Sequence, residues 1–141
     1  MTFCIGATLA MVLCAMTAGC SRSNRSPLAP ATGKVLFNGK PLQFGMVVFV
    51  SDVGRPANGI IQSDGTFRLS TYGKDDGAVI GHHRVAVTCM EQPKGSDPNG
   101  EPSPGPSLIP LKYNDYKTSG LEATVKDKNE PFVFELTGKA P

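Results

Sequence analysis

The stretch from Gly33 to Tyr72 reads GKVLFNGKPLQFGMVVFVSDVGRPANGIIQSDGTFRLSTY, and its pattern indicates the fold class. Short apolar runs are interrupted by Asn38-Gly39 and by Asp64-Gly65. These dipeptides favour tight turns between antiparallel strands, because Asn, Asp and Gly tolerate the positive φ that such turns require. The stretch is therefore predicted to form two strand-turn-strand units joined by a loop, with Gly65 at positive φ.

The run Met46–Val50 is apolar at every position. Side chains alternate along a strand, so Val47 and Phe49 share one face and the other three residues of the run share the opposite face. A strand that is apolar on both faces is usually covered on both. We expect either the Pro-rich segment 91–110 or a binding partner to cover the outer face.

The remainder of the chain continues the β pattern. Alternating apolar positions predict strands over 66–72, 83–90, 121–125 and 132–136. Cys89 falls on the same face as the core positions of its strand, so we expect a buried thiol. Residues 91–110 are too irregular for a regular element, and residues 111–116 predict a short extended or helical piece. No helix is needed to close the fold, which is expected to be all-β.

Composition sets the broad class. The chain has 141 residues, which is enough for one domain, and it contains 16 Gly, 12 Pro and no Trp. This composition suits a turn-rich β protein. The formal net charge is +2, with no basic block and no interleaved aromatic platform, so nucleic acid is not expected as a partner.

The amino-terminal segment predicts export. Residues 3–18 are apolar or small and carry no charge. They are fewer than the roughly 20 apolar residues of a membrane-spanning helix and match the core of a signal peptide. The ending Thr17-Ala18-Gly19-Cys20 resembles the lipobox of bacterial lipoproteins. That resemblance implies cleavage before Cys20, diacylglycerol on its thiol and acylation of the new amino terminus with chains such as palmitate.

This resemblance also divides the chain. It implies a lipoprotein signal peptide over 1–19, a flexible tether over 20–31 and a folded domain over 32–138. Membrane anchoring through Cys20 would be stable, because two acyl chains bury many methylenes at about 0.8 kcal/mol each. Ser21 directly after the cysteine implies an outer-membrane location. The alternative is an ordinary secretory peptide followed by a chance cysteine.

The body of the chain resembles a known domain family. The matching motifs are Gly33-x-Val35, Gly39-Lys40-Pro41-Leu42, Val47-Val48-Phe49, Gly59, Ser63-Asp64-Gly65-Thr66-Phe67 and residues 81–87. In order and spacing they resemble the carboxypeptidase regulatory-like domain, and residues 109–125 resemble a group of small bacterial lipoproteins built around one such domain. The resemblance implies a transthyretin-like Greek-key β-sandwich of about seven strands. It implies no catalytic residue and no cofactor.

Two motifs contain residue types that bind metal ions. Adjacent strand residues point to opposite faces, so His82 and His83 cannot readily chelate one ion. Asp75-Asp76-Gly77 could supply oxygen ligands to calcium, but the chain lacks the alternating ligand spacing of a dedicated loop. No metal site is therefore expected. An enzyme is not expected either, because nucleophilic catalysis needs a Ser or Cys beside a base and an orienting group.

The function predicted is that of a membrane-tethered, non-enzymatic envelope lipoprotein. Its β-sandwich would bind an unidentified protein or polysaccharide through a sheet edge, the outer face near Phe49, or the segment 91–110. Two alternative functions remain open. One is a structural subunit of an envelope assembly, and the other is a small-ligand carrier in the transthyretin manner, which requires a sizeable apolar pocket.

Overall fold

The computed structural model describes residues 25–92 and 105–141 of the chain. Its regular elements are β1 (Leu28–Ala29), β2 (Thr32–Phe37), β3 (Lys40–Pro41), β4 (Met46–Ser51), β5 (Ala57–Ile60), β6 (Thr66–Arg68), β7 (Ala78–Val79), β8 (Gly81–Thr88), the 3-10 helix η1 (Leu111–Asn114), β9 (Leu121–Val125) and β10 (Phe132–Leu136). The predicted all-β class is confirmed. Among the described residues there are ten strands, more than the number expected, and three of them (β1, β3 and β7) are only two residues long.

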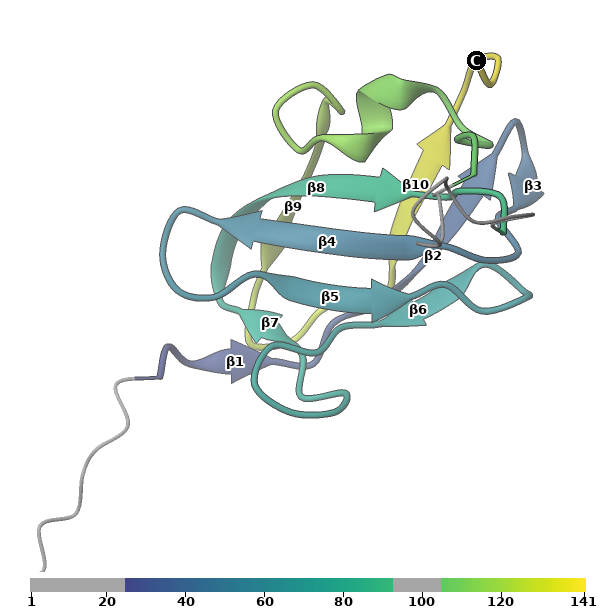
Figure 1. The fold of residues 1–141 in the computed structure, drawn as a ribbon. Helices are drawn as coiled ribbons and strands as arrows, with labels where there is room; N and C mark the ends of the chain where they lie inside the picture. The colour runs from purple at the N-terminus through teal and green to yellow at the C-terminus, as the bar shows by residue number, and fades with distance from the viewer. Residues whose placement is uncertain (1–24, 93–104) are drawn as a thin grey trace, which may run out of the picture.

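Two four-stranded sheets face each other and form a β-sandwich (Figure 1). The front sheet has the order β5-β4-β8-β9, and its neighbouring strands are all antiparallel. The back sheet is centred on β2, which pairs with β10 in parallel and with β3 and β6 antiparallel. A small ribbon of β1 and β7 lies at the end where the described chain begins, and the C-terminus lies at the opposite end.

Both predicted turns are present. Asn38 and Gly39, between β2 and β3, have φ of 50° and 80°, which is the mirror-image turn that fits the twist of a hairpin. Gly65 has φ of 83°, as predicted, and its amide donates to the Gln62 carbonyl at 2.8 Å. A β-carbon at Gly65 would lie 2.8 Å from the Val35 carbonyl oxygen. Glycine is therefore required there for space as well as for conformation.

A cluster of four phenylalanine rings joins the two sheets. Phe49 of β4 lies 6.2 Å from Phe67 of β6, and 5.6 Å and 5.8 Å from two rings of β10, measured between ring centroids. Phe49 is 0% exposed, whereas Met46 on the same strand is 37% exposed. The expectation of a binding surface near Phe49 is therefore corrected, because Phe49 faces the core. The outer face of β4 is formed by Met46, Val48 and Val50.

The first strand of the described chain precedes the predicted domain boundary. Leu28–Ala29, inside the expected tether over 20–31, pair with Val79 and Ala78 of β7. Ala29 and Ala31 are both buried, because their small side chains alternate toward the core. Gly77 makes this close approach possible, since a β-carbon there would lie 1.9 Å from the Ala29 carbonyl oxygen. The described fold therefore begins several residues before position 32.

The described ends of segment 91–110 pair with each other. Met90 and Ser107 form a bridge, and the Leu108 amide donates to the Cys89 carbonyl at 2.8 Å, so the pairing extends β8. The prediction that this segment covers the outer face of β4 concerns mainly residues 93–104, which lie outside the described residues. Cys89 is buried, as expected. Beyond the bridge, η1 supplies the short helical piece, and its buried Tyr113 accepts a hydrogen bond from the Thr137 amide at 3.1 Å.

Candidate functional site

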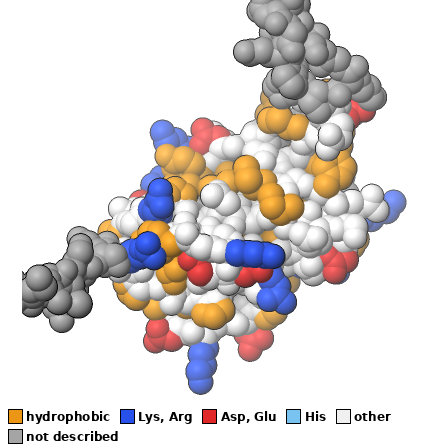
Figure 2. Space-filling view, turned by 60° about the horizontal axis from the view of Figure 1, so that its bottom comes forward, with side chains coloured by type: hydrophobic (Ala, Val, Ile, Leu, Met, Phe, Trp, Pro, Cys, Tyr) orange, Lys and Arg blue, Asp and Glu red, His pale blue; other side chains and the backbone are white. Residues whose placement is uncertain are grey.

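The one modification site expected from the sequence, Cys20, lies outside the described residues. A candidate site must therefore be sought on the surface of the sandwich. Figure 2 shows one side of that surface, where hydrophobic side chains lie between charged side chains of both signs. In the described part of the chain, no helix is long and apolar enough to cross a membrane.

His82 and His83 point to opposite faces of β8, as the strand geometry predicts. His83 is 0% exposed, and its ring centroid lies 5.7 Å from that of Phe49. Its Nε2 donates to the Val79 carbonyl at 2.6 Å, while Nδ1 has no partner among the described residues. His82 lies on the outer face with Nε2 3.5 Å from Oε2 of Glu122. Because the two rings lie on opposite faces of the sheet, they cannot bind the same ion. His83 is a core residue, since it is fully buried.

The carboxylate of Asp76 is held by the backbone of its own loop. One oxygen accepts the Thr71 amide at 2.7 Å, and the other accepts the amides of Tyr72 at 3.0 Å and Gly73 at 2.7 Å. Burial raises the pKa of Asp76, but these hydrogen bonds outweigh it, so the pKa lies below its ordinary value. The Asp76 carboxylate therefore stabilises the loop of residues 71–76. In the described ranges, no group of three or more His, Cys, Asp and Glu side chains could hold a metal ion.

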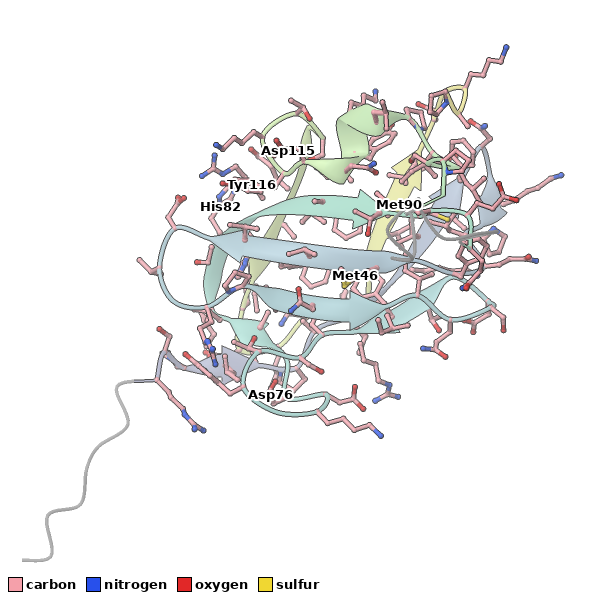
Figure 3. All side chains as sticks on the ribbon, in the orientation of Figure 1. Met46, Asp76, His82, Met90, Asp115 and Tyr116 are labelled. Carbon is pink, nitrogen blue, oxygen red and sulfur yellow. The ribbon has the colours of Figure 1, made fainter. Side chains whose placement is uncertain are left out.

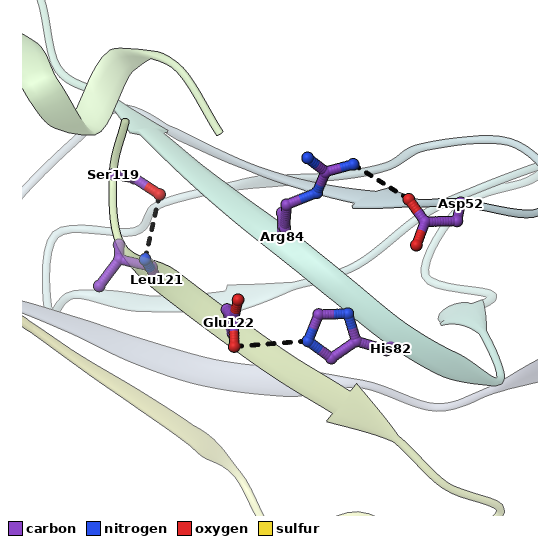
Figure 4. Close-up of polar contacts among 6 residues, drawn as sticks. All are labelled: Asp52, His82, Arg84, Ser119, Leu121 and Glu122. Atoms are coloured by element: carbon purple, nitrogen blue, oxygen red, sulfur yellow. Dashed lines mark hydrogen bonds and ion pairs between the residues drawn. The ribbon is translucent and has the colours of Figure 1, made fainter. Parts of the chain in front are cut away.

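A polar cluster occupies one end of the outer face of the front sheet, which we call the front face. The Arg84 guanidinium lies 3.0 Å from Oδ1 of Asp52, and its Cζ lies 5.2 Å from the centroid of the Tyr116 ring (Figures 3 and 4). Arg84 stands directly opposite Glu122 on β9. An arginine held between a carboxylate and an aromatic ring keeps a defined orientation, which favours specific recognition.

Ser119 fixes the turn that brings Tyr116 to this cluster. Its hydroxyl donates to the Val85 carbonyl at 2.5 Å and accepts the Leu121 amide at 3.1 Å (Figure 4). Both contacts tie the segment after η1 to β8 and β9. Ser119 is buried, and among the described residues neither histidine forms a hydrogen bond with it, so its role here is to position the turn.

The other end of the front face is apolar. Met46 pairs directly with Ile60 of β5, and Ile60 is 63% exposed. Met90, 43% exposed, lies at the same end of the sheet as Met46, whereas His82 and Tyr116 lie at the opposite end (Figure 3). The front face thus combines exposed methionine and isoleucine side chains with a tyrosine and an arginine, a composition typical of protein interfaces.

A groove of about 500 Å³ adjoins the apolar end, where β5 separates from β6. Its lining residues are Asn58, Gly59, Ile60, Gln62, Thr66, Phe67, Arg68, Ser70, Lys74 and Asp75. A β-carbon at Gly59 would lie 2.8 Å from the Arg68 carbonyl oxygen, so glycine allows β5 to approach the backbone of β6 closely at this point. The groove offers amides, hydroxyls and charged side chains beside two apolar side chains, Ile60 and Phe67, which suits an extended polar ligand or a partner's loop.

The sequence indicated only part of this surface. Alternation along β8 placed Arg84 on the outer face, but its partners Asp52 and Tyr116 come from two other segments. No local sequence pattern could have predicted that Arg84, Asp52 and Tyr116 lie together. Comparisons of the chain with protein-family models, curated proteins and solved structures found no match.

Proposed function

We propose that this chain is a membrane-tethered, non-enzymatic lipoprotein of the bacterial cell envelope, anchored in the outer membrane through lipid on Cys20. Its carboxypeptidase regulatory-like β-sandwich binds a second envelope protein through the front face. The anchoring is supported by the lipobox-like ending at Cys20. The binding role is supported by the structure of the front face.

The observation that carries the proposal is that the front face has an exposed apolar end and, at its other end, an arginine held in a defined orientation. Exposed Met46 and Ile60 form the apolar end, and Arg84, oriented by Asp52 and Tyr116, lies at the other end of the same sheet face. Binding sites on proteins commonly place buried aromatic or arginine anchors beside apolar contacts. A polysaccharide partner is the second candidate, and the groove between β5 and β6 with its amides and hydroxyls favours it.

The two alternative functions have less support. A small-ligand carrier needs an apolar interior pocket, but the space between the sheets is occupied by the phenylalanine cluster around Phe49. A structural subunit would self-associate, and the front face could serve that contact as well. The experiment below separates these outcomes.

Site-specific photocrosslinking in the native envelope tests the proposal. A photoreactive phenylalanine is placed at Ile60 on the front face and, as the matched control, at Val133 on the outer face of the back sheet, which is 64% exposed. We expect a discrete heterologous product from position 60 and none from position 133. Self-crosslinks alone would favour the structural subunit, and identical products from both positions would contradict a specific front-face site.

The anchoring is tested separately. Incorporation of a clickable palmitate analogue should label the wild-type protein and be abolished in Cys20→Ser, with the protein lost from the membrane fraction. Equal labelling of both proteins would contradict lipid attachment at Cys20, without bearing on the front face.

A further inference from the structure

Two arginines lie against one aromatic ring at the end of the sandwich where the described chain begins. Cζ of Arg25 lies 5.1 Å from the centroid of the Tyr72 ring, and Cζ of Arg55 lies 6.0 Å from it. Both arginines are exposed, and within residues 25–92 and 105–141 neither forms an ion pair with a carboxylate. The ring therefore gathers two guanidinium groups without neutralising them.

The neighbouring segments compensate this charge only in part, because the loop after Tyr72 sets one lysine, Lys74, against two aspartates, Asp75 and Asp76. The Asp76 carboxylate, on the same loop as Tyr72, is engaged by three backbone amides. The segment 126–130, tied to the Pro30 carbonyl by Asn129 at 3.1 Å, carries two lysines and two acidic residues and so adds no net charge. Figure 2 shows Lys and Arg side chains gathered at the left, where the described chain begins.

We propose that Arg25, Arg55 and Tyr72, which we call the basic pole, bind the phosphate groups of anionic phospholipids in the membrane that holds the protein. This inference rests on the proposed anchoring through Cys20. Guanidinium groups bind phosphate oxygens through paired hydrogen bonds, and tyrosine suits the boundary between headgroups and water. Both side-chain types therefore match a phospholipid surface.

The length of chain before the basic pole brings it to the lipid. Four residues lie between Cys20 and Arg25, which makes five residue steps, so the two positions are at most about 18 Å apart even in a fully extended chain. Arg22 adds a further positive charge within that segment. A lipid on Cys20 therefore keeps the basic pole close to the headgroups, where basic residues are attracted within about one Debye length of roughly 8 Å.

The contact orients the domain as well as strengthening its attachment. With the basic pole on the lipid, the opposite end, which carries the β2–β3 turn and the C-terminus, points away from the membrane (Figure 1). Each arginine near an anionic surface contributes roughly a fivefold gain in binding, so removal of both should weaken the contact about 25-fold.

A tryptophan reporter in the full-length protein tests this orientation, since the chain has no Trp. Val53→Trp places the reporter in the loop that contains Arg55, and Phe44→Trp places the control reporter on the β3–β4 connection, outside the basic pole. Fluorescence is measured on vesicles of brominated phosphatidylcholine, with and without 30% brominated phosphatidylglycerol, at low and high salt. Cosedimentation in the same samples reports attachment independently.

We expect quenching at position 53 but not at position 44, only with phosphatidylglycerol, and reversed by salt. Arg25→Gln with Arg55→Gln should abolish the quenching, whereas Lys40→Gln with Lys139→Gln, which removes the same charge at the opposite end, should retain it. Cosedimentation without quenching at position 53, or quenching unchanged by the arginine substitutions, would overturn the inference. If Cys20→Ser leaves cosedimentation on phosphatidylcholine unchanged, the anchoring proposal fails, and the phosphatidylglycerol-dependent quenching still decides the basic pole.

Discussion

The two faces of the front sheet share the same strands but differ in what they do. The inner face carries Phe49 and His83, both fully buried, and the outer face carries Met46, His82 and the cluster around Arg84. On β8 the two faces alternate from His82 to Val85, whereas Ala86, on the outer face, is buried together with its neighbours Val85 and Val87. The comparison teaches that substitutions on one face should change stability, and substitutions on the other should change binding, with little overlap.

The largest expected effect compares two positions on β4. Phe49→Ala removes the ring at the centre of the four-phenylalanine cluster and should cost about 3 to 5 kcal/mol, as should Phe67→Ala. Met46→Ala, on the outer face, should cost less than about 1 kcal/mol. Thermal and urea unfolding measure both. Equal losses would show that the outer face of β4 is buried by something in solution.

The neighbouring histidines give the next largest contrast. His83→Ala removes a ring packed against Phe49 and the hydrogen bond to the Val79 carbonyl, so we expect a loss of about 2 to 3 kcal/mol. His82→Ala removes only an exposed contact with Glu122 and should change stability by less than about 0.5 kcal/mol. Urea unfolding distinguishes the two, and a larger effect at position 82 would reverse the assignment of the faces.

Much of this contrast could be predicted from the sequence. Alternation identified Cys89 as an inner position, and glycine chemistry identified the turn at Gly65. Alternation also grouped Val47 with Phe49, but it did not show that their face is the inner one, because β4 is apolar on both faces. The strand β1 could not be predicted, because two residues carry no periodicity and their partner β7 lies some 50 positions away. The parallel pairing of β10 with β2 could not be predicted either. The periodicity of a strand indicates which side chains share a face, but it does not indicate which strand lies beside it.

A smaller effect on stability is expected for the Asp76 carboxylate, which stabilises a loop at one end of the sandwich. Asp76→Asn weakens three hydrogen bonds to backbone amides and should cost about 1 kcal/mol at pH 7. Because the pKa of Asp76 is lowered in the folded protein, its stabilisation is complete above the ordinary value of 3.8 and is lost as pH falls through the folded value. Unfolding of both proteins between pH 7 and pH 2 should show their difference shrinking at acid pH. A difference that stays constant would contradict this role.

The smallest expected change in stability belongs to the front face. Arg84→Ala breaks an exposed contact with Asp52 and should alter the free energy of unfolding by less than about 1 kcal/mol. The same substitution should abolish the heterologous crosslink from position 60. Lys126→Ala, an exposed charge outside the front face, is the control and should leave the crosslink intact. A crosslink that survives Arg84→Ala would show that the polar cluster does not take part in binding.

The pairing of β10 with β2 has a consequence for how a nascent chain acquires this fold. The β2–β3 turn is joined to the far end of the sequence by Asn38, whose side chain donates to the Gly138 carbonyl at 3.0 Å across 100 positions. Phe132 and Phe134, half of the aromatic cluster, arrive with that last strand. Closing such long loops costs chain entropy before any contact repays it, which makes folding slow. A chain still emerging during synthesis therefore cannot complete the back sheet until β10 is free to pair with β2.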